Sequence, residues 1–495
     1  MGETVTKRPN VVLCISDQQR ADTMPGDRQV PVSTPHLDWL AERGTLFRRA
    51  FCTSPMCSPA RSTILTGLYP HATGLVANHQ EREISREISL SPQVRILADY
   101  LQEAGYACAY TGKWHLGTGG DRRGFTDFAT RAGMHDVDGL EQNDMARFAG
   151  EAGYELGGKL TGNDVDRSTY DGRTMVGTSL LPLAFHPAAR DAAQAGQFIR
   201  RMRDRDQPFA LVYSCHEPHP SFVCPAPFAG MYDPDAMPLP ENRDDRSAYG
   251  LMRRRNDWQL RPTRDFDEGD LRQMWAYYAG AISYVDHCLG LLLEALVDTN
   301  QFDDTLFIFT SDHGEMLGSH GMLMKGSMLF DELMRIPLLI RPPGNGTGGR
   351  VNDSLVSHAD LVPTVLSGCG VDVPDGLHGS DISALVDGGR EPVREGLAFQ
   401  FHSSNWGERP TPLRGWRTER WKYVESPGGG EEFYDLQEDP NETRNRIDER
   451  EAEASIAAMR ASLRTWTEGA GDPWPSVPMP EREVPWDRDD RWGGE

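Results

Sequence analysis

The chain has 495 residues, enough to bury a large core, and its length alone predicts about two to four domains. A formal net charge of −23 argues against nucleic acids and anionic membranes as partners, and no apolar run is long enough to cross a membrane. Residues 1–9 lack the apolar core of a signal peptide. The eight cysteines form no CxxC pair and no disulfide-scaffold spacing, so we expect a reducing, cytoplasmic compartment.

Most of the chain alternates apolar strand-like runs with helical patterns, which predicts an α/β fold with a large, mostly parallel sheet between helices. The apolar runs are continuous, as is typical of strands buried on both faces. Two polar stretches, 118–185 and 224–265, are expected to be long loops that carry specificity. The predicted strands cover 10–16, 106–110, 209–215, 305–311 and 338–340, and the predicted helices cover 34–44, 92–105, 188–204 and 270–296.

The pattern changes past about residue 385, where short alternating runs predict a small antiparallel sheet followed by a helix. We therefore expect a catalytic domain over 1–385 and a smaller C-terminal subdomain over 386–495. The Pro- and Trp-rich tail after residue 470 is a candidate interface arm of a homo-oligomer. The predicted strands of the subdomain cover 397–401, 413–417, 421–424 and 432–436, and its predicted helix covers 449–467.

Chemically active side chains follow four of the predicted strands, which end at Asp17, Lys113, His216 and Asp312. Functional groups gather at the carboxyl ends of parallel strands, so we expect these four ends to converge. Two of the strands end alike, in Asp17-Gln18 and in Asp312-His313. Carboxylate, amide and imidazole ligands suit Ca²⁺, Mg²⁺ or Mn²⁺. The alternative is that both pairs only cap the strand ends.

Residues 57–67, Cys-Ser-Pro-Ala-Arg-Ser-Thr-Ile-Leu-Thr-Gly, are predicted to be a loop entering a short helix. Ser58 suits the N-cap, proline follows at the first helical position, and Gly67 suits the stop. Cys57 then lies at the helix mouth, where free N–H groups favour an anion, and Arg61 returns to the same face four residues later. The alternative is a buried thiol beside a surface arginine.

The Cys-x-Pro-x-Arg stretch followed by Leu-Thr-Gly resembles the signature of the type I sulfatases, which belong to the alkaline phosphatase superfamily. The order of predicted elements along most of the chain is also similar to a sulfatase. The resemblance implies that Cys57 is oxidised by a formylglycine-generating enzyme to an aldehyde that works as its hydrate. It further implies one divalent cation, with Ca²⁺ expected first and Mg²⁺ or Mn²⁺ as alternatives.

The resemblance also implies roles for individual residues. The formylglycine hydrate would attack sulfur, one lysine or histidine would protonate the departing alcohol, and His115 would take the proton that releases sulfate. In many sulfatases a carboxylate or an amide holds the second position of each pair. Here His313 stands opposite Gln18, so the sequence does not identify the ion. The metal ligands are then Asp17, Gln18, Cys57, Asp312 and His313, the catalytic residues Cys57, Arg61, Lys113, His115, His219 and Lys325, and the substrate-binding residues Asn78 and His216.

Three functions compete at this point. The first is a sulfatase that cleaves a small-molecule or sugar sulfate ester. The second is a phosphonate monoester hydrolase or phosphodiesterase of the same superfamily, and Lys113 favours the sulfatase because those relatives tend to carry a non-basic polar residue there. The third is an inactive binding protein on the same fold, which is disfavoured because every catalytic position is kept. The sequence does not identify the alcohol that carries the sulfate.

Overall fold

The computed structural model describes residues 8–78, 89–117, 123–131, 171–251, 260–402, 412–427 and 430–474. Its centre is an eight-stranded sheet with the order β13-β2-β12-β10-β1-β7-β4-β5. All neighbours pair in parallel except at β12, which runs opposite to both β10 and β2. The strands are β1 Asn10–Ser16, β2 Thr45–Phe47, β4 Ala107–Lys113, β5 Asp127–Arg131, β7 Phe209–Ser214, β10 Thr305–Ser311, β12 Leu338–Arg341 and β13 Arg350–Asn352.

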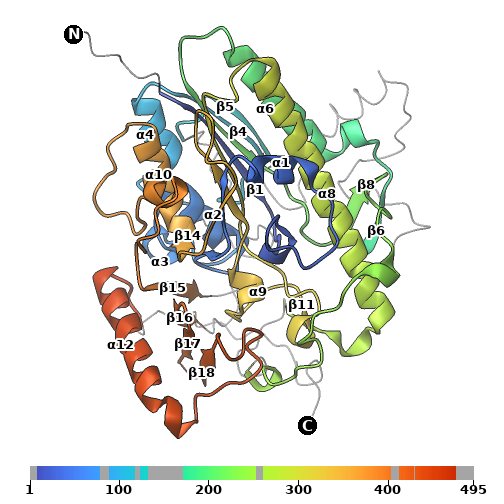
Figure 1. Cartoon of the computed structure of the whole chain (residues 1–495), viewed down its shortest axis with the longest axis vertical. Helices are drawn as coiled ribbons and strands as arrows, with labels where there is room; N and C mark the ends of the chain where they lie inside the picture. Colours follow the sequence, from blue (N-terminus) through green and yellow to red (C-terminus); the bar gives the residue numbers. More distant parts are fainter. Residues whose placement is uncertain are drawn as a thin grey trace.

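Helices cover both faces of this sheet, which confirms the predicted architecture (Figure 1). Alternate residues of β1 separate the two sides: Val11 and Leu13 pack with α2, α4 and α10, while Val12 and Cys14 pack with α1, α6 and α8. Helix α8 is long and apolar enough to cross a membrane, but 72% of its most apolar window is buried inside the molecule, as in a core helix. The helices are α1 Pro35–Ala41, α2 Cys57–Thr66, α4 Leu97–Glu103, α6 Pro187–Met202, α8 Glu268–Asp298 and α10 Leu361–Gly368.

The C-terminal part forms the predicted four-stranded antiparallel sheet, β15-β16-β17-β18, with one helix, α12, along it (Figure 1). Tyr423 and Phe433 pack under α12, while Phe399 and Val424 join the core of the large sheet's helices. The small sheet is thus held between its helix and the rest of the molecule. Its elements are β15 Gly396–Phe401, β16 Leu413–Thr418, β17 Trp421–Ser426, β18 Gly430–Asp435 and α12 Glu453–Gly469.

Some elements differ from the sequence prediction. The stretch 118–185 contains β5, an edge strand of the large sheet, and β6, Val176–Ser179, which pairs with β8, Phe222–Pro225. These strands are short and gain their stability from pairing, so their own sequence gives little signal. Most of the predicted loop 118–185, and the tail beyond residue 474, lie outside the described residues. The remaining short elements are β3 Ala50–Phe51, α3 Pro70–Thr73, β9 Arg261–Pro262, β11 Met322–Leu323, α9 Asp331–Met334, β14 Val356–Ser357 and α11 Ser383–Val386.

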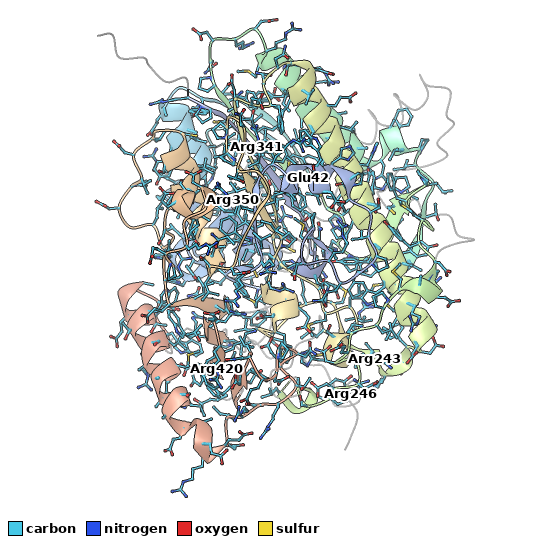
Figure 2. The ribbon with its side chains drawn as sticks, viewed as in Figure 1. Glu42, Arg243, Arg246, Arg341, Arg350 and Arg420 are labelled. Carbon is cyan, nitrogen blue, oxygen red and sulfur yellow. The ribbon has the colours of Figure 1, made fainter. Side chains whose placement is uncertain are left out.

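A charged side chain closes the amino-terminal end of the central strands. Arg341 at the end of β12 is 2% exposed, and its Nη1 donates to the carbonyls of Phe302 at 2.7 Å and Thr305 at 3.1 Å (Figure 2). Buried charges of this kind are tolerated when their donors are used. The arginine therefore fixes the loop that enters β10. The candidate catalytic residues lie at the opposite end of this strand.

Candidate active site

The four strand ends named from the sequence lie side by side, because β10, β1, β7 and β4 are consecutive in the sheet. Asp312 and Asp17 directly follow β10 and β1, Lys113 is the last residue of β4, and all three side chains are at most 5% exposed. Lys113 forms an ion pair with Asp17, and the backbone N–H of Gln18 donates to Asp312 Oδ1 at 3.0 Å. The sheet therefore brings together groups that are up to 295 positions apart in the chain.

Helix α2 places residue 57 against this edge. The helix begins at Cys57 rather than at Pro59, and the expected N-cap Ser58 is wrong: Met56 occupies that position and gives no side-chain cap. The cap comes from elsewhere in the chain, since Asn78 Oδ1 accepts the backbone N–H of Ser58 at 3.1 Å. Gly67 ends the helix in the left-handed conformation, with φ at 71°, as predicted. Cys57 thus sits in the first turn, where the helix dipole is positive.

Four buried groups, Asp17, Cys57, Asp312 and His313, offer ligand atoms that all lie within 4.8 Å of one another. His313 Nδ1 faces the carbonyl of Gly314 at 2.9 Å. A carbonyl only accepts, so the ring proton belongs on Nδ1 and the Nε2 lone pair faces the group, the usual arrangement for a metal-ligating histidine. Two carboxylates and one imidazole fit a divalent cation of the hard-to-borderline kind.

Arg61 links the two carboxylates. Its Nε donates to Asp312 Oδ2 at 2.8 Å and its Nη2 donates to Asp17 Oδ2 at 3.2 Å, while Nη1 donates to Ser214 Oγ at 2.6 Å. Burial raises the pKa of the Asp17 carboxyl, but Lys113 and Arg61 outweigh this and hold that pKa well below its usual range. The guanidinium therefore bridges the two carboxylates and helps to keep Asp17 in the ionised form that a cation requires.

Lys325 makes the contacts nearest to residue 57. Its Nζ lies 2.9 Å from Cys57 Sγ, 2.7 Å from Gln18 Oε1 and 3.1 Å from His313 Nε2. Burial and Asp17 raise the pKa of the Cys57 thiol, yet Lys113, Lys325 and His313 together bring it well below its usual value. Lys113 and Lys325 thus favour a negative charge at residue 57, which suits an anionic substrate.

Three histidines complete the cluster. His115 has a side-chain hydrogen bond with Cys57, and burial followed by Lys113 lowers its pKa. The backbone at His115 is left-handed, with φ at 55°, so the extended conformation of β4 does not continue to this residue. The rings of His216 and His219 lie 4.7 Å apart, and burial followed by Lys325 lowers the pKa of His219 well below its usual value. Both His115 and His219 are therefore neutral acceptors near neutral pH.

Two residues in this network were not identified from the sequence. Ser214, the last residue of β7, accepts from Arg61, and its place at a strand end was the available signal. Glu315 is 1% exposed and accepts the side-chain Nε2–H of Gln18. A carboxylate three positions after Asp312 could have been noticed, but only the fold shows what it contacts.

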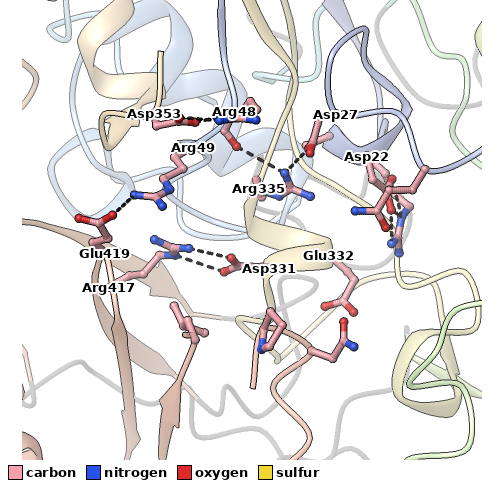
Figure 3. A pocket seen from close by; sticks show the side chains of 16 residues that line it. Asp22, Asp27, Arg48, Arg49, Asp331, Glu332, Arg335, Asp353, Arg417 and Glu419 are labelled. Carbon is pink, nitrogen blue, oxygen red and sulfur yellow. Dashed lines mark hydrogen bonds and ion pairs between the residues drawn. The ribbon is translucent and has the colours of Figure 1, made fainter. Parts of the chain in front are cut away.

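A cavity of about 410 Å³ lies elsewhere, between α9 and the edge of the C-terminal sheet (Figure 3). None of the clustered catalytic candidates lines it. Its arginines are paired with acids: Arg48 with Asp353, Arg335 with Asp27, and Arg417 with Asp331. Because these charges neutralise each other, the cavity is a seam of ion pairs between two parts of the fold rather than a second candidate active site.

Known proteins match this chain in sequence and in fold. The sulfatase family model matches residues 9–371, and the model described as "N-sulphoglucosamine sulphohydrolase, C-terminal" matches residues 318–468. An uncharacterised sulfatase of Escherichia coli K12, YidJ, is 30% identical over 99% of this chain and 93% of its own length. The multifunctional alkaline phosphatase superfamily protein PehA of Trinickia caryophylli is 32% identical over 88% of this chain and 91% of its own length.

A solved structure is similar as well. The phosphonate monoester hydrolase of Agrobacterium radiobacter superposes with a TM-score of 0.76 at 28% identity, over 94% of this chain and 96% of that one. Together the fold and the buried cluster define a hydrolase of the alkaline phosphatase superfamily. The chain belongs to the sulfatase family. Sulfatases generally use a divalent metal ion, and the buried group around Asp17 and Asp312 could hold one.

Proposed function

We propose that this protein is a formylglycine-dependent sulfatase that hydrolyses a sulfate monoester to an alcohol and inorganic sulfate. One observation carries the proposal: Cys57 Sγ, in the first turn of α2, lies 2.9 Å from Lys325 Nζ and 3.2 Å from His313 Nε2 inside a group of four possible metal ligands. A nucleophile position, fixed cations and a metal-binding geometry therefore coincide in one buried volume.

The ligands of the proposed cation are Asp17, Gln18, Asp312, His313 and residue 57. The ion, for which Ca²⁺ is our first choice, would act as a Lewis acid that lowers the pKa of a hydroxyl and neutralises charge near the ester. Oxidation of Cys57 to formylglycine would supply an aldehyde hydrate, with one hydroxyl to attack sulfur and a second whose deprotonation releases sulfate. In this structure Sγ marks the position from which those hydroxyls would extend.

The other side chains supply charge and move protons. Lys113 and Lys325 both lower the pKa of the Cys57 thiol and would bind the sulfate oxygens as negative charge builds in the transition state. His219 Nδ1 donates to the carbonyl of Pro220, so the neutral ring presents only the lone pair of Nε2, and Lys113 or Lys325 would donate the proton to the leaving oxygen. His115, which is hydrogen-bonded to Cys57, would accept the proton of the second hydroxyl, and loss of this proton releases sulfate.

The rival function is hydrolysis of a phosphonate monoester or phosphodiester. It is favoured by the likeness to the Agrobacterium radiobacter enzyme, named as a phosphonate monoester hydrolase. Lys113 argues for the sulfate ester, because its ammonium is paired with Asp17 directly beside residue 57 and adds a cation next to the transferred group. The deciding experiment is a panel of aryl sulfates, sulfated sugars, choline sulfate, phosphonate monoesters and phosphodiesters. Higher kcat/KM for a phosphonate or phosphodiester than for every sulfate would assign the protein to the rival.

A further inference from the structure

Glu315 is a buried carboxylate that the mechanism above does not use. Its Oε1 accepts the backbone N–H of Leu317 at 3.0 Å and of Met324 at 2.5 Å, and its Oε2 accepts the side-chain N–H of Gln18. Within the part of the chain that the structure describes, no ion pair joins Glu315 to a lysine or arginine. A buried carboxylate held by neutral donors is costly, so its hydrogen bonds have to be well placed.

The contacts on its two sides allow the Gln18 side-chain amide only one orientation. A carboxylate only accepts, so the NH₂ group of Gln18 must face Glu315. An ammonium only donates, so Gln18 Oε1 must face Lys325 Nζ, which lies 2.7 Å away. The backbone of Gln18 is fixed as well, since its N–H donates to Asp312 and its carbonyl accepts from Tyr278. The amide oxygen therefore faces the same ammonium that contacts Cys57 Sγ and His313 Nε2.

We propose that Glu315 is a positioning residue that keeps the Gln18 amide oxygen directed at the cation site. This inference rests on the proposed function only in requiring that a divalent cation bind at Asp17, Asp312 and His313. If the Gln18 amide were flipped, its NH₂ group would face the Lys325 ammonium and the cation. The N–H groups would then repel both of these positive charges. Residues that orient a metal ligand in this way typically contribute about 10- to 100-fold to metal affinity.

Replacement of Glu315 by glutamine should keep its contacts with the backbone and change only its contact with Gln18. Leu317 and Met324, whose N–H groups it accepts, both have left-handed backbones, with φ at 39° and 73°. In E315Q the new amide oxygen can still accept these two donors, so this loop keeps its bonds. The new NH₂ group must then face the NH₂ group of Gln18, and two donors cannot pair. Gln18 is forced to rotate while the fold is preserved.

The test is a double-mutant cycle with Q18E, E315Q and the double variant Q18E/E315Q, measured by calorimetric titration with Ca²⁺ or Mn²⁺ alone. E315Q should bind the cation about 10- to 100-fold more weakly than wild type. Q18E should also bind more weakly, because two carboxylates then face each other. In the double variant the carboxylate at position 18 can accept from the amide at position 315 and from Lys325, so affinity should return to within a few-fold of wild type. Thermal unfolding of the metal-free proteins checks that all four are folded.

The outcomes separate this inference from the proposed function. Wild-type affinity in E315Q, or a double variant weaker than both single variants, would overturn the positioning role while leaving the sulfatase proposal intact. The expected cycle in a protein that hydrolyses no sulfate ester would support the positioning role and refute the proposed activity. Failure of folded wild-type protein to bind any divalent cation would overturn both.

Discussion

Asn78 caps the helix that carries residue 57: its Oδ1 accepts the backbone N–H of Ser58 at 3.1 Å, across 20 positions of sequence. Both residues are buried, with Asn78 at 3% and Ser58 at 0% exposure. The bond satisfies one of the N–H groups that the first turn of a helix leaves without an intrahelical partner. Asn78 therefore has a structural task in addition to the substrate-binding role expected from the sequence.

Substitution of Asn78 separates these two tasks. N78A should cost about 1 kcal/mol of unfolding free energy, the usual value of a lost N-cap, measured by urea denaturation. N78D keeps an acceptor oxygen and places a negative charge at the positive end of α2, so its stability should match wild type. If the Asn78 amide also contacts the anionic group of the substrate, N78D should show a raised KM through repulsion. Unchanged kinetics in N78D would leave only the capping role.

We predict that Cys57 alone among the eight cysteines is converted to formylglycine. All eight are buried and free of disulfides, but only Cys57 lies in the Cys-x-Pro-x-Arg stretch. Because Cys57 is 0% exposed in the folded chain, we expect the modification to occur before the chain folds. Peptide mass spectrometry should show the aldehyde at residue 57 when the protein is produced with a generating enzyme. Full activity in C57A, or in protein with unmodified Cys57, would exclude the proposed nucleophile.

The sequence predicted the fold well where strands are long and buried. β1, β7 and β10 are continuous apolar runs, and their hydrophobic character reflects burial on both faces. β5 was missed because an edge strand depends on its partner β4 rather than on its own residues. The hydrophobic pattern of a segment reflects how deeply the segment is buried. This pattern therefore identifies central elements better than peripheral ones.

For the candidate site, the sequence predicted which residues lie close together but not how they contact one another. The carboxyl ends of parallel strands must share an edge, so the meeting of Asp17 with Asp312 followed from topology. The hydrogen bonds that Arg61 donates to both carboxylates did not follow from it. The cap on α2 by Asn78 and the contact of Glu315 with Gln18 depend on how loops fold back in three dimensions. No local pattern in the sequence encodes such approaches.

Removal of the metal should stop turnover without unfolding the protein. The strands of the large sheet are buried by helices on both faces and need no ion for their packing. Dialysis against a chelator should abolish activity, and addition of Ca²⁺, Mg²⁺ or Mn²⁺ should restore it, while the far-ultraviolet circular dichroism stays unchanged. D312N should lose both metal content and activity. Normal metal content in active D312N would remove this carboxylate from the site.

A buried cation links the C-terminal sheet to α9. Lys422 on β17 has a side chain that is 0% exposed, and its Nζ pairs with Asp331 and, at 2.7 Å, with Glu442. Burial is the main reason that the pKa of Glu442 rises from 4.5 to about 7, opposed by Lys422 and reinforced by Asp331 and Glu332. The folded chain thus binds this proton more tightly than the unfolded chain does. The resulting stabilisation is complete below pH 4.5 and is lost as the pH rises to about 7.

Replacement of Glu442 by glutamine should remove this pH dependence, because the amide does not titrate. The unfolding free energy of wild type minus that of E442Q should therefore fall between pH 4.5 and about 7, measured by urea denaturation across that range. E438Q is the matched control, since the Glu438 side chain is 63% exposed and should show little change. A difference between wild type and E442Q that stays constant with pH would mean that folding does not shift the pKa of Glu442.

The assignment to sulfate esters depends on Lys113. A sulfate monoester carries one negative charge, and a site with Arg61, Lys113, Lys325 and a divalent cation has more positive charge than that ground state needs. The excess becomes useful as charge builds on the attacking and leaving oxygens. K113A should therefore lower sulfatase kcat by roughly two to four orders of magnitude.

The conservative variant K113R tests whether charge alone is enough. It keeps a cation next to Asp17 but spreads it over a planar group, so it should recover part of the activity lost in K113A. Phosphodiester hydrolysis should fall less than sulfate hydrolysis in K113A, because we expect diesters to depend mainly on the metal and the nucleophile. Steady-state kinetics on both substrate classes with wild type, K113A and K113R decide the matter. An equal loss on both classes would show that Lys113 supports the nucleophile and does not select the sulfate group.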